Sequence, residues 1–308
     1  MNGEEGGRKS GHPLFLIHDS LFRRCALVLV ALAMTLTPAK AWGKTAVPHK
    51  PSAPSSFVLD LSTETVQVSD RAELVRPIAS LTKLMTAMVL LDAKADLERT
   101  VTYDSKRHYA YKNWMKFGRG DTLRGRDLFL AMLVGSQNIP ARMLVNLTPM
   151  SETQFIAAMN AKARSLGLAQ TRFHDVHGLS PKNVSTAPEV ARLLDIALTY
   201  PDIQDALGRS EATVAWQTRR GKRQERLFHH TNTLLQREQR FATEASKTGY
   251  LDEAGDTIAM RIRDPKSGHQ FIVVTLGEPR RALRFPLAKR LADRVMGSQR
   301  IAGARIHE

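Results

Sequence analysis

Hydrophobic and polar positions follow successive patterns along this chain of 308 residues. Two short β-prone runs, 57–61 and 65–68, are separated by three polar positions and predict a hairpin. Apolar residues at helical spacing then predict a helix over about 80–94. Four more helices are predicted over 128–134, 141–147, 152–166 and 189–198, with Gly167 as a C-cap and Pro201 as the residue that stops the last of them.

The final third of the chain returns to strand-like patterns. Strands are predicted over 213–216, 257–262 and 271–276, and a basic helix is predicted around 287–295. The order of strands, helices, strands and helix predicts an α+β fold. In it an antiparallel sheet is flanked by helices and carries an all-helical insertion over about 104–205.

The first 41 residues have the pattern of a cleavable export signal. Arg23 and Arg24 precede an apolar run over 25–36, and small residues surround a cleavage site after Ala41. The run is shorter than the roughly 20 apolar residues that a spanning helix needs. The alternatives are an uncleaved anchor and a buried helix. A Pro- and Ser-rich linker is expected over 42–55, a folded domain over 56–300 and a short tail over 301–308.

The cysteine count and the net charge limit the kinds of chemistry and of binding partner that we expect. The chain has one cysteine, Cys25, which leaves with the predicted signal, so neither a disulfide nor a catalytic thiol is expected. The net charge is +15, and cleavage removes five basic and three acidic side chains, which leaves +13. Because we expect the mature protein in the periplasm, its charge favours an anionic cell wall over nucleic acid. No later segment is long and apolar enough to be a predicted membrane span.

Three short elements combine residues that can carry out acyl transfer. Ser80 and Lys83 stand three positions apart at the start of the first predicted helix, so the amine can reach the hydroxyl and activate it as a base. The second element pairs Ser136 with Asn138, between two predicted helices. The third is Lys247-Thr248-Gly249, ahead of strand-like residues, where a cation and a hydroxyl can bind a carboxylate.

Each element also has an ordinary structural alternative. Ser80 is suited to a helix N-cap, Ser136 to the N-cap of a helix that begins near Pro140, and residues 247–249 to a turn. The three together, in this order, are typical of serine acyl-transferring enzymes. The segment with His174, Asp175 and His177 could offer metal ligands, but it is a predicted loop without a clear further partner, so a metal site is not expected there. No cofactor is predicted.

The sequence resembles the low-molecular-mass penicillin-binding proteins, the D-alanyl-D-alanine carboxypeptidases and endopeptidases. The similarity covers about 56–296, and residues 75–87 resemble the family's nucleophile region almost residue for residue. Further similar segments lie at 120–123, 127–128, 172–173, 177–180, 183–187 and 230–235. Two departures are Gln137, in the middle of the second motif, and Ile139-Pro140 directly after it, either of which can reshape the rim of the cleft.

The resemblance implies a DD-peptidase and β-lactamase-like fold and a role for each motif residue. Ser80 is then the acylated nucleophile and Lys83 its general base. Ser136 relays a proton, Asn138 positions the substrate, and Lys247, Thr248 and Gly249 bind it. The oxyanion hole is implied at the backbone NH groups of Ser80 and Tyr250. The implied partners are peptidoglycan stem peptides as substrates and β-lactam antibiotics as covalent inhibitors.

The short C-terminal part favours one branch of this family. Only 59 residues follow Gly249, enough to complete the sheet and to add the helix around 287–295. We therefore expect that helix to pack on the sheet, and we expect an endopeptidase that cleaves D-alanyl-diaminopimelate cross-links. The alternative within the family is a carboxypeptidase that trims pentapeptides. More distant alternatives are a β-lactamase, for which no Glu-x-x-Leu-Asn is present, and a non-catalytic wall-binding protein.

Overall fold

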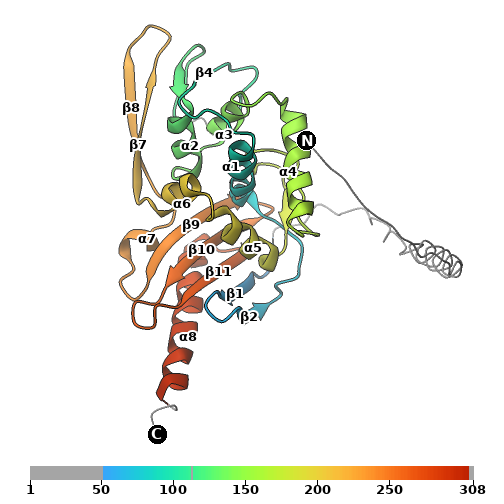
Figure 1. Cartoon of the computed structure of the whole chain (residues 1–308), viewed down its shortest axis with the longest axis vertical. Helices are drawn as coiled ribbons and strands as arrows, with labels where there is room; N and C mark the ends of the chain where they lie inside the picture. Colours follow the sequence, from blue (N-terminus) through green and yellow to red (C-terminus); the bar gives the residue numbers. More distant parts are fainter. Residues whose placement is uncertain (1–50, 112–113, 305–308) are drawn as a thin grey trace, which may run out of the picture. The chain divides into compact units, whose positions relative to one another are not determined.

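The computed structural model describes residues 51–111 and 114–304 (Figure 1). The predicted export signal and most of the predicted linker lie outside the described residues. A five-stranded antiparallel sheet has the strand order β2-β1-β11-β10-β9. Its strands are β1 (Ser55–Asp60), β2 (Thr65–Asp70), β9 (Ala242–Leu251), β10 (Gly255–Arg263) and β11 (Gln270–Glu278). The predicted hairpin is confirmed, since β1 pairs with β2.

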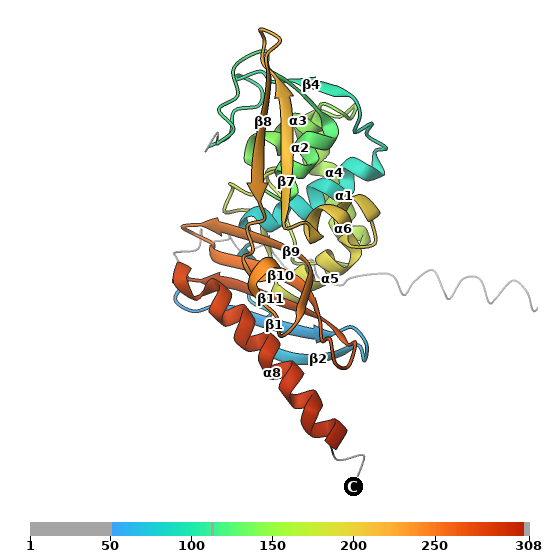
Figure 2. The same cartoon turned by 90° about the vertical axis from the view of Figure 1, so that its left-hand side faces the viewer.

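Alternating side chains along each strand build a separate core on each face of this sheet. Val58, Ile258 and Val273 belong to a core with α8 (Arg284–Ala304), which lies along one face (Figure 2). Their neighbours Phe57 and Val274 belong to the larger core, which the helices on the opposite face of the sheet share. The prediction that the C-terminal helix packs on the sheet is confirmed, although α8 extends past Gly297, where the basic segment was expected to end.

The helices on the other face surround one helix that is buried over most of its length. This helix, α1 (Thr82–Asp92), follows a 3-10 turn, η1 (Ala79–Leu81), and every residue over 82–90 is buried. Its neighbours are α2 (Gly125–Leu133), α3 (Asn138–Val145), α4 (Glu152–Ser165), α5 (Ala187–Ala197) and α6 (Pro201–Gly208). Gly167 follows α4 with a positive φ of 72°, as a C-cap glycine does.

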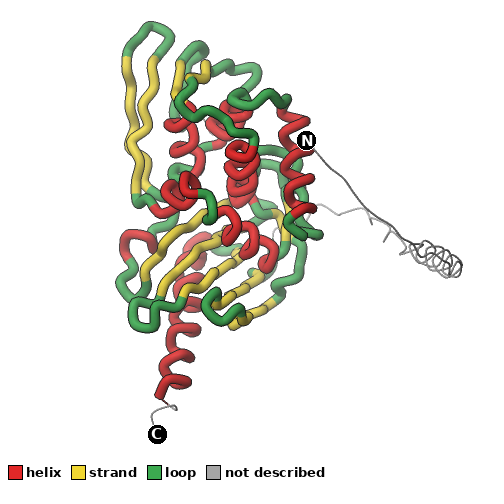
Figure 3. The backbone as a smooth tube through the Cα atoms, viewed as in Figure 1, coloured by secondary structure: helices red, strands yellow, loops and turns green. Residues whose placement is uncertain are grey.

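Two smaller sheets complete the fold. One pairs β3 (Arg76–Pro77) with β6 (Val184–Ser185). The other has the order β4-β5-β7-β8, with strands β4 (Thr100–Thr102), β5 (Thr122–Arg124), β7 (Glu211–Gln217) and β8 (Arg223–His229). Figure 3 shows the long β7–β8 hairpin beside α2. The α+β prediction is confirmed, and the segment 104–205 also contains the short strands β5 and β6.

Some elements were not predicted, and one local prediction is wrong. Helix α5 ends before Pro201, as predicted, but Pro201 also opens a further helix, α6, at a position where its missing NH costs nothing. Strand β8 has mostly exposed side chains, so its apolar pattern is too weak to predict a strand. Residues 247–249 lie inside β9 rather than ahead of a strand or in a turn. Among the described residues, no helix has the length and apolar character needed to cross a membrane.

Candidate active site

Ser80 lies in the 3-10 turn before α1, on a backbone that its neighbours hold in an unusual conformation. Ala79 has a positive φ of 47° and is fully buried. The carbonyl of Ala79 faces Gly178, where an added Cβ would lie only 2.1 Å from its oxygen. Because Leu81 is the N-cap of α1 and Ser80 makes no capping bond, the N-cap alternative for Ser80 is wrong.

Lys83 connects the nucleophile to two other segments. Its Nζ donates to Ser80 Oγ at 2.9 Å, to Asn138 Oδ1 at 2.9 Å and to the carbonyl oxygen of His177 at 2.5 Å. The side chain is fully buried, and this burial lowers the pKa of Lys83 to about 7, although Asp175 raises it in part. A substantial share of neutral amine is therefore present near pH 7, and such an amine can take the proton of Ser80.

The carbonyl of His177 is held in place by a loop built around Asp175. The Asp175 carboxylate accepts hydrogen bonds from the backbone NH groups of His177 (3.0 Å), Gly178 (2.5 Å) and Ser180 (2.5 Å) and from the side chain of Asn183 (2.8 Å). Burial raises the pKa of Asp175, but the His177 side chain, whose Nδ1 lies 3.3 Å from the carboxylate, and the donors at Gly178 and Asn183 outweigh it, so the pKa is well below its usual value. The carboxylate thus has a structural role, because it shapes the loop that contacts Lys83.

Ser136 reaches the site from the turn between α2 and α3, and Asn138 reaches it from the first position of α3. Ser136 has a positive φ of 55°, and its Oγ accepts a hydrogen bond from Lys247 Nζ at 2.7 Å. The N-cap of α3 is Gln137, so the N-cap alternative for Ser136 is wrong. Gln137 is buried and donates to the carbonyl of Gly135, and Ile139 is buried as well. The departures at 137 and 139 therefore stabilise this turn instead of lining the cleft.

The third motif lies on β9, one of the two edge strands of the sheet. An outer strand has a backbone edge to which an extended peptide can bind. Thr248 donates to the hydroxyl of Thr231 at 2.7 Å. Lys247 is fully buried, and burial together with the nearby charges of Lys83 and Arg284 lowers the pKa of Lys247 well below its usual value. A bound carboxylate would favour the charged amine at this position.

Gly249 allows β9 to approach the nucleophile. A Cβ at this position would lie 2.7 Å from the backbone nitrogen of Ser80 and 2.9 Å from the Cβ of Ala79. Real Cβ atoms do not approach backbone so closely, so either β9 or η1 would have to move. The predicted oxyanion hole requires this approach, since it combines the NH groups of Ser80 and Tyr250, the residue that follows Gly249.

We expect Gly249→Ala to slow acylation by a fluorescent penicillin by about 10²-fold, because a shift of about 1 Å between reacting groups has an effect of this size. The rate of gel labelling measures the effect. Gly118→Ala is the matched control, since the nearest atom to its added Cβ is 3.6 Å away. Equal labelling rates for the two variants would contradict the close approach of β9 to Ser80.

Sequence reasoning assigned no role to a buried network behind Lys247. His230 lies between the carbonyl of Ser246, 3.1 Å from its Nε2, and the NH of Asn232, which donates to its Nδ1 at 3.0 Å. Burial and then the charge of Lys247 lower the pKa of His230 to about 4, so the ring is neutral near pH 7. The Asn232 amide also donates to the Ser246 hydroxyl at 3.1 Å. Although 230–235 resembled the family, no local pattern shows that these side chains support β9.

A backbone contact also links Asn138 to the β4–β5 loop. The Asn138 amide donates to the carbonyl of Tyr111 at 3.1 Å, while its oxygen accepts from Lys83. Main-chain carbonyls such as those of Tyr111 and His177 have no sequence signature, so neither contact was predicted. Among the described residues, no three His, Cys, Asp or Glu side chains gather as a metal ion would require.

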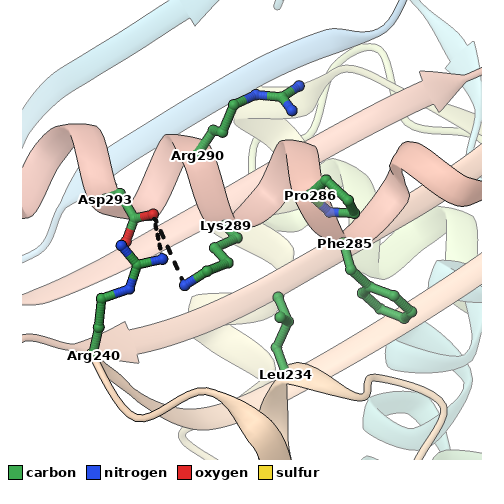
Figure 4. A pocket seen from close by; sticks show the side chains of 7 residues that line it. All are labelled: Leu234, Arg240, Phe285, Pro286, Lys289, Arg290 and Asp293. Atoms are coloured by element: carbon green, nitrogen blue, oxygen red, sulfur yellow. Dashed lines mark ion pairs between the residues drawn. The ribbon is translucent and has the colours of Figure 1, made fainter.

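A hollow lies between α8 and the α7 (Leu234–Arg237) segment, and no residue of the three motifs lines it (Figure 4). Its volume is about 420 Å³, and Arg240 and Lys289 both lie near the carboxylate of Asp293, at 3.0 and 3.9 Å. None of the predicted site residues lines this hollow, so we place the chemistry at Ser80.

Residues 43–280 match the model of a family described as D-alanyl-D-alanine carboxypeptidase. The chain belongs to this family. Within it, the chain is 35% identical over 243 residues to the D-alanyl-D-alanine endopeptidase of Escherichia coli, an alignment that covers 79% of this chain and 77% of the relative. It is 34% identical to the D-alanyl-D-alanine endopeptidase of Pseudomonas aeruginosa, with 82% and 83% covered.

A solved structure has the same fold. Penicillin-binding protein D2 of Listeria monocytogenes, in its ampicillin-bound form, aligns with a TM-score of 0.64 and 25% identity, and the alignment covers 82% of this chain and 98% of that one. The predicted DD-peptidase fold and the resemblance to penicillin-binding proteins are thereby confirmed. The chain is an enzyme of a serine peptidase family.

Proposed function

We propose that this enzyme is a D-alanyl-D-alanine endopeptidase that cleaves D-alanyl-diaminopimelate cross-links of peptidoglycan through an acyl-enzyme at Ser80. The observation that carries the proposal is Lys83, a buried amine with a pKa near 7 that lies 2.9 Å from Ser80 Oγ. The endopeptidase branch is supported by the two relatives of that name at 34 and 35% identity.

The proposed reaction has two steps. Neutral Lys83 takes the proton of Ser80 while Oγ attacks the D-alanyl carbonyl, and the NH groups of Ser80 and Tyr250 stabilise the oxyanion. The C–N bond then breaks, and the proton returns to the leaving amine through Lys83 or through Lys247 and Ser136, which are 2.7 Å apart. Water hydrolyses the ester in the second step and regenerates Ser80.

The substrate is proposed to lie as an extended peptide along the outer edge of β9. Asn138 positions its amide, and Lys247 and Thr248 bind a carboxylate of the peptide. Burial disfavours the charged form of Lys247, and a bound carboxylate would favour it. Gly249 allows β9 to lie close to the backbone of Ser80, and the proposed chemistry assigns no role to a metal ion or cofactor.

We further propose that the enzyme works in the periplasm, where the predicted export signal would send it and where its substrate is found. β-Lactams are proposed to acylate Ser80, since ampicillin and cefotaxime are present in the structures of penicillin-binding protein D2. The family description favours a second candidate, a carboxypeptidase that removes the terminal D-alanine.

Purified enzyme incubated with cross-linked muropeptide dimers and, separately, with pentapeptide monomers tests the proposal. We expect dimers to be converted to monomers at a rate that Ser80→Ala abolishes. If the enzyme trims pentapeptides but leaves dimers intact, it is a carboxypeptidase instead. Rapid turnover of penicillin would indicate a β-lactamase. A protein that reacts with neither dimers, pentapeptides nor penicillin would be a wall-binding protein. Either result would contradict the proposal.

A further inference from the structure

A strongly basic surface lies on two segments to which the proposed reaction assigns no role. One is the β4–β5 loop, and the other is the tip and second strand of the β7–β8 hairpin (Figures 1 and 2). We call their exposed cationic side chains the basic rim. The basic rim consists of Lys106, Arg107, Lys116 and Arg119 on the loop and of Arg219, Arg220, Lys222, Arg223 and Arg226 on the hairpin.

The two segments are joined into one surface. The buried carboxylate of Asp121 accepts from the NH of Arg219 at 3.1 Å and from the NH of Gly118 at 2.9 Å, so it links the hairpin to the loop. The rings of Phe117 and Trp216 pack edge to face with centroids 5.7 Å apart. Packed aromatic rings and a buried carboxylate fix the relative position of the two segments, which therefore present their charges together.

Few acidic groups neutralise this surface. Of the nine side chains, only Arg223 lies within ion-pair distance of a carboxylate in the described chain, that of Glu225 at 3.8 Å. Asp104 accepts instead from backbone NH groups of its own turn, and Asp121 is occupied as described. A cluster of solvated positive charges raises the concentration of an anionic polymer near this surface.

The basic rim continues into the active site through a group of aromatic side chains. Tyr109, Tyr111 and Trp114 are 61 to 62% exposed, three of the eight large hydrophobic residues exposed in the described chain. The carbonyl of Tyr111 accepts from Asn138, and that of Trp114 accepts from Arg226 of the hairpin. Exposed aromatic faces adjacent to cations are typical of binding surfaces.

We propose that the basic rim and these three aromatic residues bind the peptidoglycan strand that carries the scissile peptide, through the carboxylates of neighbouring stem peptides. This inference rests on the proposed function. The polymer presents many carboxylates along one strand, so a surface next to Asn138 can hold the strand while a single cross-link enters the site. Attachment of this kind raises the effective concentration of cross-links without any new contact to the scissile bond.

The test compares two variants that each lose four positive charges. The rim variant is Arg219→Gln, Arg220→Gln, Lys222→Gln and Arg223→Gln, and the control variant is Arg192→Gln, Lys266→Gln, Arg290→Gln and Arg294→Gln, all exposed residues elsewhere. Binding to purified sacculi, stripped of attached polymers, is measured by co-sedimentation at low and high salt. Sacculi with carboxylates converted to neutral amides serve as the uncharged ligand.

We expect the rim variant to bind sacculi and to digest them at least tenfold less well than wild type, while the control variant stays within twofold. Binding by wild type should also fall at least tenfold on amidated sacculi. Equal losses for the two variants, unchanged binding by the rim variant, or unchanged binding to amidated sacculi would each overturn the proposal.

Cleavage of soluble dimers separates this inference from the proposed function. All three proteins should cleave dimers at similar rates, since the basic rim contributes only to polymer binding. If none cleaves dimers but the rim variant alone loses binding, the function is wrong and the binding surface stands. If all cleave dimers and sacculi equally well, the function stands and the binding surface is wrong.

Discussion

Replacing Ser80 by alanine is expected to reduce cleavage of cross-linked dimers by about 10⁴-fold or more and to abolish labelling by penicillin. The reason is that the variant lacks the oxygen that forms the acyl-enzyme, and loss of a catalytic nucleophile has effects of this size. Dimer cleavage followed by chromatography and gel fluorescence with a labelled penicillin measure both effects.

The Ser80→Ala variant should remain folded. The Ser80 side chain has one described hydrogen bond, from Lys83, and no capping bond to α1. The control is Ser165→Ala, at the exposed end of α4, where the hydroxyl donates only to the carbonyl of Lys162. Both variants should unfold at nearly the same temperature as wild type. Substantial dimer cleavage by a folded Ser80→Ala enzyme would mean that the nucleophile lies elsewhere.

The rate of acylation is expected to rise with pH and to reach half of its maximum near pH 7. Lys83 acts as a base only when neutral, and burial lowers its pKa to about 7. Below that pH the neutral fraction falls about tenfold for each pH unit, and above it the rate should level off. Stopped-time labelling with penicillin between pH 5 and pH 9 measures the profile.

Substitution of Lys83 tests the same claim without a change of pH. In Lys83→Arg the guanidinium stays protonated at all accessible pH values, so it keeps the charge but cannot accept the proton of Ser80. We expect acylation to fall at least about 10³-fold in Lys83→Arg and in the uncharged variant Lys83→Met. A flat pH profile in wild type, or nearly full activity in Lys83→Arg, would exclude Lys83 as the base.

The parts of the fold that were predicted from sequence are those whose burial leaves a regular apolar pattern. Strand β11 is buried almost throughout, and α5 has a clear apolar face, so both were found near their observed positions. Strand β8 is solvated at most positions, and β9 contains polar residues over 246–248 that are buried. Local apolar patterns therefore could not identify these strands.

The candidate site was predictable to the extent that its residues lie close in sequence. The spacing of Ser80 and Lys83 places both side chains within one helical turn, and their observed contact at 2.9 Å follows from it. The contact of Lys83 with the carbonyl of His177 joins positions 94 residues apart and depends on the loop around Asp175. Such a contact arises only from the tertiary structure.

Mass spectrometry of the penicillin-treated enzyme tests the central claim most directly. Trypsin does not cut between Arg76 and Pro77, so Ser80 lies in the single peptide 72–83. We predict one penicilloyl group per chain, attached to Ser80 of this peptide and missing in Ser80→Ala. An adduct on any other residue, or no adduct in a folded wild-type enzyme, would contradict the account.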